Sequence, residues 1–247
     1  MERHFEQELD KLNKRILKMG NLVAEQVHNS LMALLEGNTE IALQIIENDK
    51  KVDKLDVKID KLCQRIFALT QPVATDLRLI MAALRMNNDL ERMGDHAVSI
   101  ATKVESISEY RDIIIELHID DIVRMTDMIV NDVIIILNSR NTAFVKDIFD
   151  LALTIEEKVH GISAKIIDEM MHKSEVIVVA TQLILILTAI DRLAAYSTNI
   201  AESIIFIVDG TMMKHKSRFN SENSPENPES EVTAPPSLME PDPEQTE

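Results

Sequence analysis

Residues 89–101, Asp89-Leu-Glu-Arg-Met-Gly-Asp-His-Ala-Val-Ser-Ile-Ala101, return in altered form 100 positions later as Ala189-Ile-Asp-Arg-Leu-Ala-Ala-Tyr-Ser-Thr-Asn-Ile-Ala201. The identical pairs are Arg92/Arg192, Ile100/Ile200 and Ala101/Ala201. Other pairs keep their size or charge character, among them Leu90/Ile190 and Glu91/Asp191. Self-similarity of this kind indicates a duplicated structural unit. We therefore predict a chain built from two related halves.

The composition of the chain favours a helical bundle. Hydrophobic residues make up 45% of the sequence, but only 3% is aromatic, tryptophan is absent and 13 methionines contribute to the apolar set. Pro72 is the only proline before residue 225. A many-stranded sheet would need more glycine and proline in its turns than this chain carries. The composition predicts an all-α protein with enough apolar side chains for one substantial core.

Apolar residues recur at intervals of three or four along six segments, which is the period of an amphipathic helix. The predicted helices cover about residues 5–36, 40–69, 76–106, 113–137, 143–172 and 175–208. Thr75, Asn141 or Thr142, and Ser174 are candidate N-terminal caps, and Gly210 is a candidate terminator of the last helix. We predict two tandem three-helix-bundle repeats, residues 1–109 and 110–216, packed into one elongated six-helix bundle.

Residues 217–247 differ from the rest of the chain. They are acidic and rich in proline, with almost no apolar residue before Leu238. Such a segment cannot bury enough apolar surface to offset the entropy of ordering it. The sequence therefore predicts a disordered tail, and we expect this tail to keep the protein soluble.

Charge and targeting signals narrow the class of function. The formal net charge is −16, which repels the phosphate backbone of nucleic acids and argues against binding them. Cys63 is the only cysteine, so an intramolecular disulfide is excluded and a buried thiol is expected. The N-terminus lacks the pattern of a secretory signal, and the apolar run 176–190 is shorter than a membrane span. We predict a cytoplasmic protein.

Carboxylates form the candidate site for chemistry. Glu91 and Asp95 are four residues apart and share one helix face, and an acidic stripe on the preceding helix comprises Asp49, Asp53, Asp56 and Asp60. Two facing acidic helices can supply the four to six oxygen ligands that a divalent or ferric ion requires. The alternative is a solvated helix face whose aspartates pair with neighbouring lysines such as Lys51, Lys54 and Lys58. Arg92 and Arg192 are expected to bond to carboxylates or helix ends within the bundle.

Residues around this carboxylate pair resemble the signature of a known protein family. The string Asp89-Leu-Glu-Arg-Met-Gly-Asp-His96, preceded by Gln71-Pro72-Val-Ala-Thr-Asp-Leu-Arg78, resembles the signature of the PhoU family of accessory regulators of bacterial phosphate uptake. The segment Asp49-Lys-Lys-Val-Asp53 and the echo Asn199-Ile-Ala-Glu202 belong to the same resemblance. It extends over about residues 1–212.

The resemblance implies a cytoplasmic, often homodimeric all-helical protein without catalytic activity. It implies negative regulation of phosphate uptake and starvation signalling through two partners, the ATPase subunit of the Pst phosphate transporter and a phosphate-sensing histidine kinase. It also implies metal binding. Glu91 and Asp95 match the metal motif of the first repeat, and Asp49 and Asp53 are weaker candidates. The metal's identity is left open between divalent and ferric ions.

The second repeat departs from the family pattern. Asp191 keeps an acid, but Ala195 and Tyr196 stand where the family has an acid and a polar or basic residue. One carboxylate cannot hold a cluster of metal ions, so we expect the second site to be lost or weakened.

Two other classes of function compete with this interpretation. Ferritin-like di-metal oxidases use Glu-x-x-His on facing helices, and such tetrads begin at Glu25, Glu157 and Glu169. Their positions are not equivalent in the two repeats, which argues against an oxidase. A helical adaptor in another pathway, binding metal or metal-free, is the closer alternative. Glycine-rich phosphate loops and nucleophile motifs are absent from the sequence, so we do not expect an enzyme.

Overall fold

The structure, a computed structural model, describes residues 2–72 and 74–210, and within these ranges every regular element is a helix. The predicted tail, residues 217–247, lies outside the described residues. The all-α class and the arrangement of two three-helix units in one bundle are confirmed. We call the helices from α1 to α4 the first unit and those from α7 to α9 the second unit.

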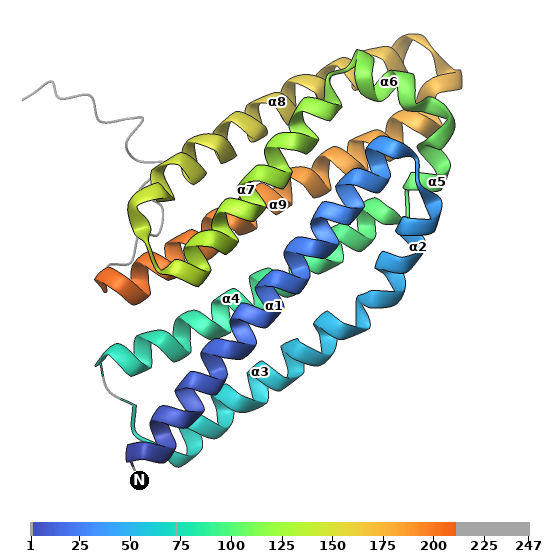
Figure 1. Ribbon diagram of the computed structural model, residues 1–247. Coiled ribbons are helices and arrows are strands. Elements are labelled where there is room, and N and C mark those ends of the chain that lie inside the picture. Colours follow the sequence, from blue (N-terminus) through green and yellow to red (C-terminus); the bar gives the residue numbers. More distant parts are fainter. Residues whose placement is uncertain (1, 73, 211–247) are drawn as a thin grey trace, which may run out of the picture. The chain divides into compact units, whose positions relative to one another are not determined.

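The first unit contains three long helical paths. They are α1 (Glu2–Glu36), α2 (Thr39–Asn48) followed by α3 (Lys50–Leu69), and α4 (Ala74–Ala101). Helices α3 and α4 both pack on α1 and on each other (Figure 1). The buried stripe of α3 repeats at intervals of three or four residues, for example Val52, Leu55 and Ile59, as its sequence predicts.

Short helical segments join the first unit to the second. They are α5 (Val104–Ile107), the 3₁₀ turn η1 (Ser108–Tyr110) and α6 (Arg111–Glu116). The second unit comprises α7 (Ile119–Ser139), the turn η2 (Thr142–Phe144), α8 (Val145–His172), the turn η3 (Ser174–Val176) and α9 (Ile177–Asp209). The predicted boundary at residue 109 falls within the joining turns, and the division into two repeats stays a prediction because both units share one core.

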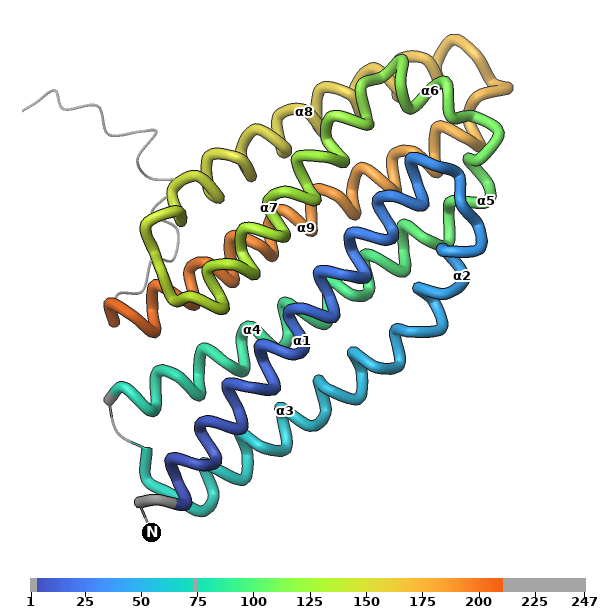
Figure 2. Tube along the Cα trace, in the orientation of Figure 1, coloured from blue at the N-terminus to red at the C-terminus, as the bar shows by residue number. Residues whose placement is uncertain are grey.

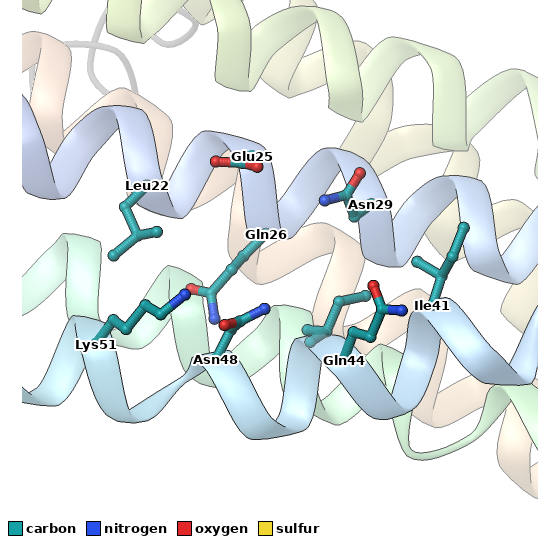
Figure 3. A pocket seen from close by; sticks show the side chains of 9 residues that line it. Leu22, Glu25, Gln26, Asn29, Ile41, Gln44, Asn48 and Lys51 are labelled. Carbon is teal, nitrogen blue, oxygen red and sulfur yellow. The ribbon is translucent and has the colours of Figure 1, made fainter.

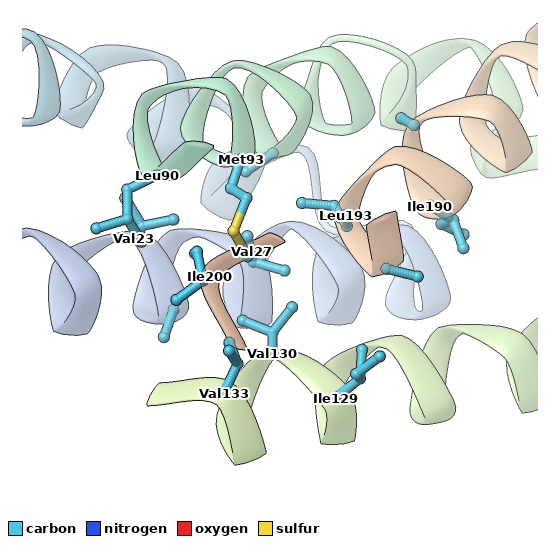
Figure 4. Packing of buried hydrophobic residues seen from close by; sticks show 14 of the residues in the cluster. Val23, Val27, Leu90, Met93, Ile129, Val130, Val133, Ile190, Leu193 and Ile200 are labelled. Atoms are coloured by element: carbon cyan, nitrogen blue, oxygen red, sulfur yellow. The ribbon is translucent and has the colours of Figure 1, made fainter. Parts of the chain in front are cut away.

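The shared core lies where the repeated helices meet. Helix α4 packs along α9, and α1 packs along α7 (Figure 2). Leu90, Met93, Leu193 and Ile200 are fully buried there, and Figure 4 shows them beside apolar side chains of α1 and α7. Burial of this contiguous apolar cluster holds the units together, since area removed from water is the main stabilising contribution to folding.

Glycine and asparagine residues mark several helix ends. Gly37 and Gly210 adopt left-handed conformations with φ of 67° and 71°, which glycine reaches without steric cost. The Asn38 side chain accepts a hydrogen bond from the backbone N–H of Ile41 and caps α2. Asn141 accepts one from the backbone N–H of Ala143 and so caps the turn η2 that leads into α8, not α8 itself. Gly210 terminates α9 as expected.

Other helix boundaries were predicted wrongly. The expected helix 40–69 is interrupted at Asp49, and α4 ends at Ala101, five residues early. The helix expected from residue 113 begins at Ile119, because His118 takes a left-handed conformation and separates it from α6. Thr75 lies inside α4 instead of capping it, and Ser174 makes no side-chain cap. Periodicity does not register these breaks, because the apolar spacing continues across them.

Helix α9 covers nearly the predicted range, residues 175–208, and is strongly apolar. Residues 174–209 are long and apolar enough, by length and composition alone, to cross a membrane, and 44% of the most apolar stretch is buried within the protein. Asp191 and Arg192, which follow the apolar run 176–190, lie inside the helix, as in the predicted range. Since α9 packs against α4, α7 and α8, its apolar sides serve the core of the bundle.

Candidate functional site

The predicted acidic residues meet at the packing seam of α3 and α4. We define the acidic face as Asp49, at the junction of α2 and α3, Asp53, Asp56 and Asp60 of α3, and Glu91 and Asp95 of α4. Asp53 and Asp95 are exposed, whereas the other four side chains are partly buried. The structure therefore brings all four predicted site residues, Glu91, Asp95, Asp49 and Asp53, to one surface.

The carboxylates of the acidic face influence one another across the seam. The pKa of Asp49 is raised by burial and by the charges of Asp53 and Asp95. The pKa of Glu91 is raised by burial and by Asp95, Asp56 and Asp53, with Arg92 opposing. Burial and Asp60 likewise raise the pKa of Asp56. Like charges held this close oppose ionisation and favour a cation that neutralises them.

A buried asparagine on α4 lies between two of these aspartates. Asn87 is fully buried, and its Nδ2 donates hydrogen bonds to Asp56 Oδ1 at 2.6 Å and to Asp60 Oδ1 at 3.3 Å. Its Oδ1 has no hydrogen-bond partner among the described residues. The amide thus offsets part of the negative charge at one end of the acidic face and keeps one oxygen unpaired.

A buried glutamine from α1 lies at the other end of the acidic face. Gln26 is 3% exposed and lowers the pKa of Asp49, yet neither of its amide atoms meets the geometry of a hydrogen bond to a described residue. A Cβ added at Gly94 would lie 3.6 Å from Asp49 Oδ1 and 3.7 Å from Gln26 Oε1. A methyl group at this position would therefore meet both oxygens at ordinary van der Waals distances.

The chemistry of this donor set suits a hard cation. Six carboxylates and two buried, incompletely bonded amides are oxygen donors of the kind that divalent and ferric ions bind. In the present side-chain positions, no three His, Cys, Asp or Glu residues within 2–72 and 74–210 converge closely enough to hold an ion. The donor types fit a metal, and binding one would require the exposed carboxylates to change rotamer.

Sequence reasoning missed Gln26 and Asn87. Gln26 precedes the buried Val27, and Asn87 follows the buried Met86. A polar residue next to the apolar stripe of a helix was the only sign in the sequence that these amides are buried. The prediction of metal ligands considered charged residues alone. Amide side chains became relevant only when the fold placed them against the acidic face.

The second unit lacks this constellation at the equivalent positions. Asp191 and Ala195 are partly buried, and Tyr196 stacks on the His96 ring with centroids 5.7 Å apart. The guanidinium of Arg92 lies 5.9 Å from the centre of the Tyr196 ring. Arg92 thus contacts an aromatic ring of α9, and no ion pair of Arg92 with a carboxylate is found within the described ranges.

Asp89 is a further unpredicted feature of the interface between the repeats. Burial raises its pKa to about 6, although a hydrogen bond from Asn199 and the charges of Arg92 and Arg85 act in the opposite direction. Asn199 Nδ2 donates to Asp89 Oδ1 at 3.4 Å. Asp89 therefore links α4 to α9 at a cost in folding stability when it is ionised.

The histidines of two Glu-x-x-His tetrads and the single cysteine make structural contacts within the bundle. His28 of the first Glu-x-x-His tetrad pairs with Asp127 of α7 at 2.9 Å, and His172 hydrogen-bonds to the backbone carbonyl of Asp168 on its own helix. Cys63 is fully buried, as expected, and burial raises the pKa of its thiol to about 12. These groups have local roles within the bundle.

Known proteins resemble both the sequence and the fold. A family model described as PhoU domain matches residues 16–104. The PhoU homolog of Aquifex aeolicus, described as a phosphate-specific transport system accessory protein, is 30% identical over 85% of this chain and 95% of its own length. The corresponding protein of Serratia marcescens is 30% identical over 85% of this chain and 87% of its own length.

Two crystal structures share the architecture. PhoU from Pseudomonas aeruginosa has a TM-score of 0.77 at 26% identity, covering 84% of this chain and 100% of that one. The phosphate transport system regulatory protein PhoU from Streptococcus pneumoniae has a TM-score of 0.75 at 28% identity, covering 85% and 99% of the two chains. The resemblance expected from residues 71–96 thus extends through the bundle, and the chain belongs to the PhoU family.

Proposed function

We propose that this chain restrains phosphate uptake and phosphate-starvation signalling when phosphate is plentiful. The observation that carries the proposal is its similarity, over 85% of its length, to proteins named as accessory proteins of the phosphate-specific transport system. The proposed partners are the ATPase subunit of the Pst transporter and a phosphate-sensing histidine kinase. The protein acts from the cytoplasm as a homodimer, by docking on these partners and favouring their inactive states.

Regulation by docking requires a difference in affinity between two states of the partner. A ligand shifts such an equilibrium only by as much as it prefers one state over the other. The described part of this chain offers a bundle with a continuous core, which suits a rigid docking body. A catalytic role is not proposed.

The acidic face is the proposed metal site, with Glu91, Asp95, Asp49 and Asp53 as carboxylate ligands for a divalent or ferric ion. A bound cation would neutralise the repulsion that raises the pKa values of Asp49 and Glu91. Asp56 and the buried amides of Gln26 and Asn87 border the same surface. Metal supply would then set how well the first unit is ordered and how strongly the protein docks.

A deletion strain tests the regulatory proposal. Phosphate uptake and the expression of a phosphate-starvation reporter are measured in phosphate-rich medium, in the deletion strain and after restoring the wild-type protein. We expect uptake and reporter output to rise on deletion and to fall on restoration. Normal uptake and normal reporter output in the deletion strain would overturn the proposal and favour a helical adaptor in another pathway.

Restoring variants in the same deletion strain tests whether the acidic face is needed for regulation. Restoring the Glu91→Ala/Asp95→Ala variant should leave uptake high, while an Asp191→Ala variant in the second unit should behave as wild type. If the Glu91→Ala/Asp95→Ala variant represses fully, the acidic face takes no part in regulation.

A further inference from the structure

A small polar cavity lined by Gln26 lies on the first unit. It is formed by α1, α2 and the first turn of α3, with a volume of about 160 Å³ (Figure 3). An engineered protein cavity of about 150 Å³ is large enough to hold benzene, so this one has room for a ligand of five or six heavy atoms. Its polar lining consists of Glu25, Gln26, Asn29, Gln44, Asn48 and Lys51.

Gln26 is the reason to assign a ligand to this cavity. Its side chain is buried, and both its amide nitrogen and its amide oxygen lack a hydrogen-bond partner among the described residues. Figure 3 shows the amide group directed towards Asn48 and Lys51. Leaving a buried amide unpaired is costly, and native proteins pair such groups with protein, water or ligand.

The chemistry of the lining favours an anion with several oxygens. Lys51 offers an ammonium group with three donors, and the amides of Gln26 and Asn48 each offer an NH₂ group. Figure 3 shows these three side chains converging from α3, α1 and α2. Glu25 is the only acid in the lining and is exposed to solvent. Charge-assisted hydrogen bonds from an ammonium group to an oxyanion are stronger than those between neutral groups.

The geometry points to a binding site for a small tetrahedral oxyanion of the phosphate class, held by Lys51, Asn48 and Gln26 between α1 and the junction of α2 and α3. The volume admits inorganic phosphate and is too small for a nucleotide. The site is separate from the acidic face, because Lys51 and Asn48 belong to the cavity lining and none of the six acidic-face residues does.

Gln26 connects this cavity to the acidic face. The same side chain lines the cavity and lies beside Asp49, the residue at which the helical path from α2 to α3 is interrupted. An oxyanion that engages the Gln26 amide changes the surroundings of Asp49, and a cation on the acidic face offsets the repulsion between Asp49 and the oxyanion. Binding of the two ions is therefore coupled, with each raising the affinity for the other.

Phosphate binding to the purified full-length protein tests the site. Isothermal titration calorimetry with inorganic phosphate is performed after chelator treatment and again with Mg²⁺ present. We expect one phosphate per chain, with tighter binding when Mg²⁺ is present. Sulfate should compete and adenosine monophosphate should not, which distinguishes the free ion from a phosphorylated metabolite. Absence of saturable phosphate binding under both conditions would overturn the proposal.

Matched variants locate the bound ion. Lys51→Met should weaken phosphate binding at least tenfold, while Lys54→Met, which removes an exposed lysine one turn away and outside the lining, should leave it unchanged. Equal weakening by both variants would indicate a general charge effect and refute the site. Asn48→Leu provides a second cavity variant if Lys51→Met fails to fold, as judged by circular dichroism.

This inference stands apart from the proposed regulatory function. Phosphate binding is measured on purified protein, whereas regulation is measured as uptake in cells. Phosphate binding in the cavity without an effect on uptake would support the proposed site and refute the proposed function. An effect on uptake without phosphate binding would support the function and refute the site.

Discussion

The first and second units use the same helical plan but differ in chemistry at particular matched positions. In α4, Asp95 belongs to the acidic face and Gly94 lies next to it, whereas α9 carries Ala195 and Ala194 in their places. The first unit leaves amide atoms of Gln26 and Asn87 buried without partners. One unit thus keeps incompletely bonded polar groups, which native proteins tend to retain where a ligand completes them.

Two buried hydroxyl groups of the second unit are satisfied by carbonyl groups of their own helices. Thr126 donates to the carbonyl of Ile122, and Ser197 donates to that of Leu193. Groups paired in this way call for no ligand. The comparison teaches that two units with the same helical plan differ in their buried polar groups, of which those in the first unit are incompletely bonded.

The largest difference between the units should appear in metal content. Protein loaded with Mn²⁺ or Fe³⁺ and then desalted should lose its bound metal entirely in the Glu91→Ala/Asp95→Ala variant, because α4 would contribute no carboxylate to the acidic face. Asp191→Ala should retain the wild-type amount. Inductively coupled plasma mass spectrometry measures both. If both variants lost the same amount of metal, both units would contribute to the site, and the proposed difference between them would be wrong.

Core truncation should affect the two units equally. Leu90 and Ile190 occupy equivalent positions in the repeats and are fully buried. Replacing either by alanine should lower the free energy of unfolding by about 2–5 kcal/mol, through lost apolar burial and the cavity that remains. Chemical denaturation measures the change, with Leu43→Ala as an exposed control. A marked loss for one position alone would show that the repeats do not share a single cooperative core.

Ionisation of Asp89 should destabilise the seam between the units. Its pKa in the folded protein is about 6, above the ordinary value of 3.8, so the folded state holds more protons than the unfolded state between these pH values. Stability contributed by the neutral carboxyl is present below about pH 4 and lost as pH rises through about 6.

Asp89→Asn should therefore stabilise the protein by about 1–2 kcal/mol at pH 7.5, after allowance for its partial exposure to solvent, and have little effect at pH 4. The variant keeps a side-chain oxygen that can accept the hydrogen bond from Asn199. Urea denaturation at the two pH values measures the difference. A gain of the same size at both would mean that ionisation of Asp89 is not its cause.

The smallest expected effect comes from exchanging glycine and alanine between the repeats. At Gly94 a methyl group would meet Val52 Cγ1 at 3.4 Å, an ordinary van der Waals distance. Gly94→Ala should therefore stabilise the protein by about 0.5–1 kcal/mol, because glycine is unfavourable inside a helix. Ala194→Gly should destabilise it by a similar amount. Thermal denaturation measures both, and destabilisation by Gly94→Ala would mean that α3 and α4 tolerate no added volume there.

Much of the fold could be predicted from the period of apolar residues. The stripes that include Leu90 and Leu193 predicted long helices, and the related segments 89–101 and 189–201 predicted that these helices are counterparts. Amphipathic periodicity follows directly from helical geometry, so the sequence alone carries it. The break at Asp49 and the left-handed His118 were not predictable in this way, because both depend on how neighbouring helices constrain the backbone.

The sequence by itself determined that the chain is helical and acidic, predicted its duplication, and identified Glu91, Asp95, Asp49 and Asp53 as candidate ligands. Only the tertiary structure decided that these carboxylates share one surface and that Gln26 and Asn87 lie buried beside them. The physical reason is that helical periodicity specifies which residues share a face of one helix. Partners across a packing seam depend instead on how whole helices come together in the core.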